Sequence, residues 1–228
     1  MNEMIDYTLL NQAELNDELF IAATNNDLET VKYLLISPEL KLHADINFDY
    51  DLVFKKACEY GYVNIVKFIL ETPGLNREQG LSRSFKDAAQ MAYQNGHLNL
   101  LKYLIDDFFS EYELDHSRLA RQIMDASCSD GNLEQIKYVL SNPKLNQHID
   151  ISYRNDEYFI TACAWDKLNV VEYFIFELNI PKSEHISNFI EKRVGYENVI
   201  EMFSKREFRE SLQSELEINS SKAKKVKI

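Results

Sequence analysis

The sequence AYQNGHLNLLKYLI at residues 92–105 is the third of five similar segments that decide the fold of this chain. The other four segments begin at residues 22, 57, 127 and 162, so neighbouring copies are always 35 residues apart. A repeat of this length is typical of a solenoid, in which each unit packs only on its neighbours. The chain is therefore expected to stack repeated units in one direction, and such stacks present long surfaces to partners.

Two positions in these segments carry the residue types that a tight turn between helices requires. The first position of each segment holds a small residue, which lets neighbouring helices approach closely: Ala22, Ala57, Ala92, Ser127 and Ala162. Four residues later is the turn position, whose residues tolerate a left-handed backbone: Asn26, Gly61, Gly96, Gly131 and Asp166. Each segment therefore predicts a helix that ends at the turn position.

A second helix is predicted after each turn position. In the first copy the apolar residues fall at positions 28, 31, 34 and 35, on one face of a helix, and this spacing recurs in all copies. Next to the second of these positions is a Lys in four copies and Glu172 in the fifth, followed by an aromatic residue in all five. In three copies the helix then meets a proline, which cannot continue it: Pro38, Pro73 and Pro143. Each repeat is thus a helix–turn–helix unit.

These segments resemble the ankyrin repeat, with its pattern A-A-x-x-G-H-x-x-V-V-x-x-L-L, over residues 11–185. The resemblance implies an all-α fold, an ankyrin-like α-solenoid of helix–turn–helix repeats with terminal caps. The family's T-P-L-H segment keeps only its apolar position here, and the unit is longer than the usual 33 residues, so the shape of the finger segments before each inner helix stays open. The tetratricopeptide repeat fits less well, because it lacks the spacing between the small residue and the turn glycine.

The ends of the chain depart from the repeat in ways that suit terminal caps. VGYENVIEMF at residues 194–203 resembles a shortened sixth copy, with Glu191 and Glu197 where small and apolar residues stood before. We predict one solenoid over residues 1–203, with caps at about 1–17 and 186–203 and repeats from about residue 18. Residues 204–228 are predicted to form a charged helical extension and, after Ile218, a basic disordered tail.

The composition limits the classes of function. The chain has 228 residues, a net charge of −12, no apolar run of membrane length and acidic residues where a secretory signal would be basic. The odd number of cysteines, three, favours a reducing compartment. We therefore expect a cytoplasmic protein, or one in the host cytosol if it is an effector, with no membrane or duplex nucleic acid as partner. The motif K-K-x-K at residues 224–227 leaves a nuclear signal open.

No pattern in the sequence predicts a catalytic, metal or cofactor site. Cys58, Cys128 and Cys163 occupy the same position of the first helix, just after the small residue, which indicates core packing. A zinc site needs Cys or His pairs at close spacing, and no glycine-rich phosphate loop is present either. We expect a protein that is not an enzyme and holds no cofactor.

The resemblance implies that partners dock on the concave side, through the two residues before the turn position and through the finger segments. Trp165 and Tyr60 both directly precede a turn residue, and aromatic residues are frequent interface hot spots. Alternatively, Trp165 packs beneath the shortened sixth repeat. Both interpretations stay open at the level of sequence.

The finger segments carry a group of basic and aromatic residues within an acidic protein: Arg83, Lys86, Arg118, Arg121, Tyr153 and Arg154. Because the planar arginine fork suits carboxylates and phosphates, this strip predicts a partner protein with an acidic or phosphorylated surface. Equally, the arginines can belong to longer inner helices and pair with local acids.

We therefore expect a non-catalytic protein-interaction module that is monomeric when free. It would act as an adaptor, a decoy or an inhibitor, a role that also suits a pathogen or viral effector. The alternative is a sensor that binds a phosphorylated small molecule or nucleotide through the arginine strip.

Overall fold

The computed structural model describes residues 5–75, 81–108 and 115–225, and within these ranges all regular secondary structure is helical. This confirms the predicted fold class of helix–turn–helix repeats. The chain forms two compact units, Met1–Leu114 (unit 1) and Asp115–Ile228 (unit 2). The division expected at residue 203 stays a prediction.

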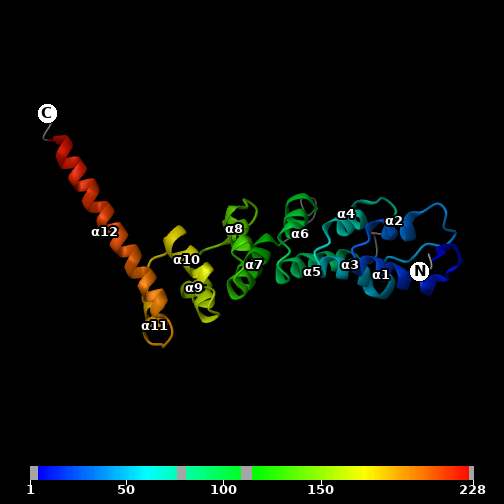
Figure 1. The fold of residues 1–228 in the computed structure, drawn as a ribbon, viewed down its shortest axis with the longest axis horizontal. Coiled ribbons are helices and arrows are strands. Elements are labelled where there is room, and N and C mark those ends of the chain that lie inside the picture. The colour runs from blue at the N-terminus through cyan, green and yellow to red at the C-terminus, as the bar shows by residue number, and fades with distance from the viewer. Residues whose placement is uncertain (1–4, 76–80, 109–114, 226–228) are drawn as a thin grey trace. The chain divides into compact units, whose positions relative to one another are not determined.

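Unit 1 contains three helix pairs. Its elements are the 3-10 turn η1 (Tyr7–Leu9), α1 (Gln12–Thr24), α2 (Leu28–Ile36), α3 (Phe48–Glu59), α4 (Val63–Glu71), α5 (Leu81–Gln94), α6 (Leu98–Lys102) and the π-helical turn η2 (Tyr103–Phe108). The inner helices α1, α3 and α5 pack on one another in order, and each outer helix packs on the inner helix before it (Figure 1).

Unit 2 continues the same arrangement. Its elements are α7 (His116–Asp130), α8 (Leu133–Ser141), the 3-10 turn η4 (Asn146–His148), α9 (Tyr153–Ala164), α10 (Leu168–Glu172), the π-helical turn η5 (Tyr173–Glu177), α11 (Glu184–Glu191) and α12 (Glu197–Lys225). Helix α7 packs on α8 and α9, α9 packs on α10 and α11, and α11 packs on α12.

The turn position has a left-handed backbone in all five copies, as predicted. The φ angles are 58° at Asn26, 72° at Gly61, 76° at Gly96, 80° at Gly131 and 54° at Asp166. This conformation reverses the chain between an inner and an outer helix within three residues, and it explains why only Asn, Gly and Asp occur there.

The outer helices end in two ways, depending on proline. Where a proline follows, the helix ends two residues before it, and the residue between them is an extended C-cap: Ser37, Thr72 and Asn142. The two copies without proline, α6 and α10, continue into the π-helical turns η2 and η5. The prolines therefore set the length of the outer helix, as the sequence predicts.

Hydrogen bonds to main-chain carbonyls join neighbouring repeats. In unit 1 the residue after the turn position donates to the preceding repeat: Tyr62 Oη to the Thr24 oxygen at 3.2 Å, and His97 Nε2 to the Glu59 oxygen at 2.7 Å. In unit 2, Asn169 Nδ2 donates to the Gly131 oxygen at 2.9 Å. Each bond therefore joins the beginning of an outer helix, or the residue just before it, to the end of the inner helix or the turn of the preceding repeat.

The core of unit 2 contains one polar pair that departs from the repeat pattern. Ser127 occupies the small position and Gln135 a position that is aliphatic in three other copies, and both are buried. The Ser127 hydroxyl donates to Gln135 Oε1 at 2.9 Å, so the two substitutions compensate each other.

The terminal caps differ from the sequence expectation in detail. At the N-terminus Leu15 is buried, but Ile5 and Leu9 are exposed, so the cap covers less than predicted. At the C-terminus α12 continues past Ile218 to Lys225, where we predict a disordered tail; Ala and Lys are good helix formers and extend it. Within the described ranges, no helix combines the length and the apolar composition that a membrane span requires.

Candidate functional site

Trp165 and Tyr60 are exposed at equivalent ends of their inner helices. Trp165 is the C-cap of α9 with 63% of its surface exposed, and Tyr60 is the C-cap of α3 with 44% exposed. Tyr60 stands next to Tyr62 and Lys56, with ring centroids 5.6 Å apart and the ammonium 5.7 Å from its ring. Trp165 is far more exposed than a packed residue would be, which argues against the alternative that it lies beneath the sixth repeat.

Arg118 and Arg121 lie inside α7, in its first turns. The helix begins at His116, and the Asp115 side chain caps it by accepting from the Arg118 main-chain N–H at 2.9 Å. The finger positions are therefore helical in this repeat. The Arg118 side chain is exposed, whereas Arg121 is half-buried.

The residues equivalent to Arg121 in other repeats face neighbouring repeats rather than solvent. Asn16, Asp51 and Asp156 are all buried. Asn16 Oδ1 accepts from the Asp45 main-chain N–H at 2.8 Å, and Asp156 accepts from the hydroxyl of Ser183, the N-cap of α11. This position therefore connects one repeat to the next, which favours a structural role for Arg121.

Arg154 has an unusual backbone and an acidic neighbour. Its φ angle is 47°, in the left-handed region that bulky residues seldom occupy, and its exposed guanidinium lies 3.7 Å from Glu157. Such strain is often found at functional positions. Burial raises the pKa of Asp125, Glu157 raises it further, and Arg154 and Arg121 oppose the rise. The arginines of unit 2 are thus interleaved with acids and do not form a purely basic strip.

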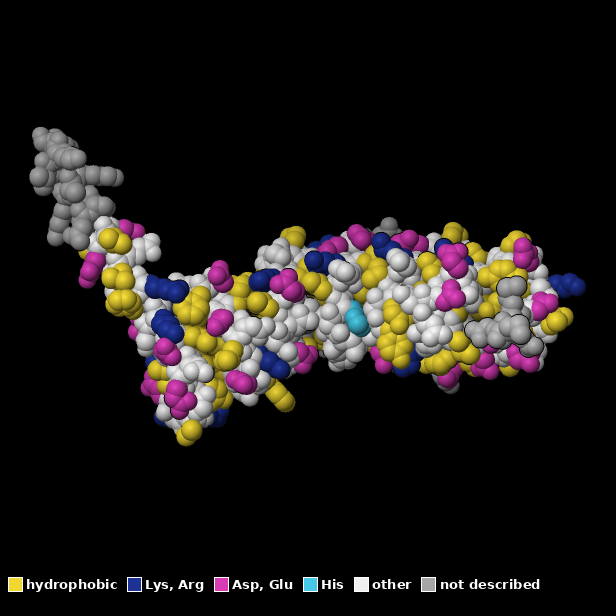
Figure 2. Space-filling model, viewed as in Figure 1, with side chains coloured by type: hydrophobic (Ala, Val, Ile, Leu, Met, Phe, Trp, Pro, Cys, Tyr) yellow, Lys and Arg dark blue, Asp and Glu magenta, His cyan; other side chains and the backbone are white. Residues whose placement is uncertain are grey.

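Three further residues were predicted to belong to the site. The side chains of Arg83, Lys86 and Tyr153 lie outside the described part of the chain. On the face of the molecule shown in Figure 2, acidic and basic side chains are interspersed with apolar ones.

The cysteines are packed inside the inner helices. Cys58, Cys128 and Cys163 are free and buried. Burial raises the pKa of Cys128 and of Cys163 to about 12 and that of Cys58 still higher, so the reactive thiolate is disfavoured at neutral pH. Among the described residues, no three His, Cys, Asp or Glu side chains are grouped so that they could hold a metal ion.

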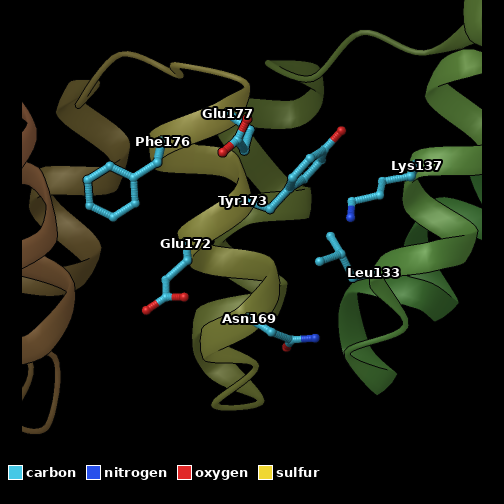
Figure 3. Close-up of a pocket in the computed structure, with 7 residues that line it drawn as sticks. All are labelled: Leu133, Lys137, Asn169, Glu172, Tyr173, Phe176 and Glu177. Atoms are coloured by element: carbon cyan, nitrogen blue, oxygen red, sulfur yellow. The ribbon is translucent and has the colours of Figure 1, made fainter.

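The structure also contains a groove of about 360 Å³ between outer helices, which the sequence analysis did not identify. It lies between α8 and α10–η5 and is lined by Leu133, Lys137, Asn169, Glu172, Tyr173, Phe176 and Glu177 (Figure 3). Lys137 points toward the Tyr173 ring, 5.7 Å from its centroid, and Lys67 lies 4.6 Å from the Tyr103 centroid in unit 1. The recurring Lys and aromatic positions were the sequence signal for this contact.

Comparison with known proteins agrees with the repeat pattern. Residues 19–116 match the family model described as ankyrin repeats, in three copies. No curated protein and no solved structure matches the chain. The match begins within α1 and ends at the first residue of α7, so it includes α2 to α6 in full.

Proposed function

Because this chain is an ankyrin-repeat protein, we propose that it is a non-catalytic module that binds another protein through the exposed side of its inner helices. Ankyrin repeats generally mediate protein–protein interaction, and proteins built from them are typically non-enzymatic scaffolds. The partner occupies two patches, one in each unit, and the protein acts as an adaptor, a decoy or an inhibitor in the cytosol.

The exposure of Trp165 is the observation that carries this proposal. A large aromatic side chain that is 63% exposed costs solvation free energy in the free protein and regains it on binding. The stack does not need this side chain, because the equivalent positions in other repeats include Asn25 and Asn95. Trp165 is therefore the proposed anchor of the patch in unit 2, and Arg118 and Arg154, near the starts of α7 and α9, are its proposed charged residues.

Tyr60 is the proposed anchor in unit 1. It occupies the position equivalent to Trp165, and Lys56, which is ion-paired with Glu59 at 2.7 Å, stands against its ring. Arg121 is left out of the proposed patch, since its position is used between repeats.

The experiment begins with capture of the partner from the native cell and its identification by mass spectrometry. Affinity is then measured for Trp165→Ala and for the matched control Val194→Ala, which removes an apolar side chain that is 96% exposed in the α11–α12 connection. We expect Trp165→Ala to weaken binding by more than about 1 kcal/mol, about fivefold, with the unfolding midpoint unchanged. Equal affinities of the two variants would show that the partner uses another face.

Charge reversal tests the kind of partner. Arg118→Glu and Arg154→Glu should slow association and reduce its salt dependence if the partner surface is acidic or phosphorylated. Faster association of both variants would instead indicate a basic partner. We do not propose the nucleotide sensor, because no observation on the described residues favours it over a protein partner.

Localisation has a separate test. Residues 224–227 match K-K-x-K, a pattern found in nuclear localisation signals. We expect the full chain and a variant lacking residues 219–228 to be cytosolic alike in a nucleated cell. A full chain that is nuclear, with a variant that moves to the cytosol, would assign the tail as a nuclear signal.

A further inference from the structure

Helix α12 extends well beyond the helices that it packs against. Its first turns bury Val199 and Phe203 in unit 2, and Arg206 donates to the carbonyl oxygens of Ile175 and Ile180. From residue 207 to residue 218 every side chain is exposed. The helix leaves the other helices of unit 2 as a single rod (Figure 1).

The projecting part carries a stripe of exposed apolar side chains. Phe208, Leu212 and Leu216 are 63%, 44% and 69% exposed and follow one another at four-residue intervals, on one face. Leu212 comes nine residues after the buried Phe203, which is about two and a half helical turns. The stripe therefore faces away from the core of unit 2 and does not continue it.

Such a segment needs a partner in order to be stable. A helix of this length without tertiary contacts is marginal in water, since most helical stability in proteins comes from packing an apolar face. Three large apolar side chains in one row are more than scattered exposure explains.

We propose that a second copy of this chain covers the stripe, with the two α12 helices antiparallel and Leu212 near the two-fold axis. In this register Phe208 of each copy is level with Leu216 of the other, so the apolar row is complementary to itself. The inference is independent of the proposed function, and it replaces the monomer that the sequence led us to expect.

Charge selects the antiparallel orientation over the parallel one. Lys205 is paired with Glu201 and Arg206 with Glu210 on the same helix, so Arg209 is the basic side chain next to the stripe that carries the argument. Antiparallel pairing about Leu212 puts Arg209 of each copy level with Glu215 of the other. Parallel pairing in register would put Arg209 level with Arg209 and Glu215 level with Glu215.

The antiparallel register also leaves room for the rest of unit 2. Phe203, the last core residue of α12, is level with residue 221 of the second copy. The two Phe203 residues are thus about 27 Å apart along the helix axis. Arg209, whose guanidinium lies 5.4 Å from the Phe176 ring centroid, marks the far edge of unit 2 on this helix and stays clear of the other copy's Arg209.

The oligomeric state of the full chain tests the proposal. Sedimentation equilibrium should show a concentration-dependent dimer, with dissociation at least about tenfold easier for Leu212→Glu. The matched control Ser214→Glu adds the same charge on the opposite face and should leave the dimer intact. A monomeric wild type overturns the proposal, as does a dimer that Leu212→Glu leaves unchanged or that both variants weaken equally.

Cross-linking tests the orientation. Leu212→Cys should form a disulfide-linked dimer on mild oxidation, whereas Ser214→Cys should not, and the native cysteines are buried. A mixture of Phe208→Cys and Leu216→Cys chains should give mostly the mixed pair. Self-linked Phe208→Cys dimers in its place would indicate parallel helices and overturn the proposed register.

Discussion

Ser127 and Gln135 satisfy each other in the core of unit 2, at positions where the other copies are mostly small or aliphatic. We predict that Ser127→Ala lowers the free energy of unfolding by about 1–3 kcal/mol, because it removes a hydrogen-bond partner of a fully buried amide. The double variant Ser127→Ala/Gln135→Leu should recover part of this loss, since it removes both groups of this hydrogen bond. Urea unfolding of the two single variants and the double variant measures the coupling, and strictly additive effects would contradict it.

His116 is the residue whose titration should couple to folding. Its Nε2 atom is buried and has no hydrogen-bond partner among the described residues. Burial lowers the pKa of His116 below 6.5, the value of a free histidine side chain; Lys144 and His148 lower it further, and Asp115 opposes them. Below pH 6.5 the unfolded chain therefore binds a proton that the folded protein does not, so this contribution to stability is lost as the pH falls.

Unfolding midpoints at about pH 7.5 and about pH 5.5 check this prediction. His116→Asn should show a smaller loss of stability on acidification than the wild type. His185→Asn, in the exposed first turn of α11, is the matched control and should keep the loss. An unchanged loss in His116→Asn would assign the pH dependence to other groups.

The positions of single residues were predictable where the repeat itself constrains them. The place of Trp165 before a turn is read from the sequence, which left open whether the side chain is exposed or packs beneath the sixth repeat. The half-buried state of Arg121 was not predictable either, because burial at its position depends on the next repeat, as the contact between Asp156 and Ser183 shows. A pattern within one segment contains no information about that packing.

At the scale of helices, the joint between repeats depends on close approach at the turn. Gly61 has a φ angle of 72°, and a Cβ built there would lie 2.5 Å from the His97 ring. Gly74 has a φ angle of 87°, with nothing within 4 Å of its Cβ position. Gly61→Ala should therefore be more destabilising than Gly74→Ala. For Gly74→Ala the only expected cost is that of a side chain in the left-handed backbone region, about 1–2 kcal/mol.

Urea unfolding of both variants gives the comparison. In the double variant Gly61→Ala/His97→Ala, the Gly61 substitution should destabilise the protein no more than Gly74→Ala does, because the clash disappears with the His97 ring. Equal costs for the two glycines would mean that the His97 side chain moves aside freely.

Helix boundaries were predictable where a local signal marks them. The prolines that follow Ser37, Thr72 and Asn142 end their helices as expected. The π-helical ends η2 and η5 were not predictable, because no residue type marks them. The starts of α1 and α7 do carry N-capping side chains, Asn11 and Asp115, which the sequence analysis did not use. The extension of α12 to Lys225 was missed for a related reason: polar composition predicts exposure, and exposed residues with good helix propensity can still be helical.

At the scale of the whole molecule, stability should come from the repeated apolar positions. Leu104 is fully buried in unit 1, so Leu104→Ala should cost about 2–5 kcal/mol. Leu9→Ala removes the same atoms from a side chain that is 80% exposed and should change stability by less than about 0.5 kcal/mol. Urea unfolding followed by circular dichroism measures both, and similar midpoints would contradict the assigned core.

The division into two units could not be predicted from the repeat. The 35-residue spacing continues unchanged from the third copy to the fourth, across the boundary at residue 114. The sequence period indicates that each segment can form the same structure. It does not indicate how tightly two neighbouring repeats pack on each other.

The hydrogen bonds from Tyr62 and His97 have a consequence for how such a chain can change over generations. Their acceptors are main-chain carbonyls, which every amino acid supplies, so the donor does not depend on which side chains its neighbour carries. A gene segment encoding one repeat could be duplicated, lost or exchanged, and this joint would form again at the new junction. Tyrosine and histidine both reach the equivalent carbonyl oxygen, so the donor can vary from repeat to repeat while the joint is kept.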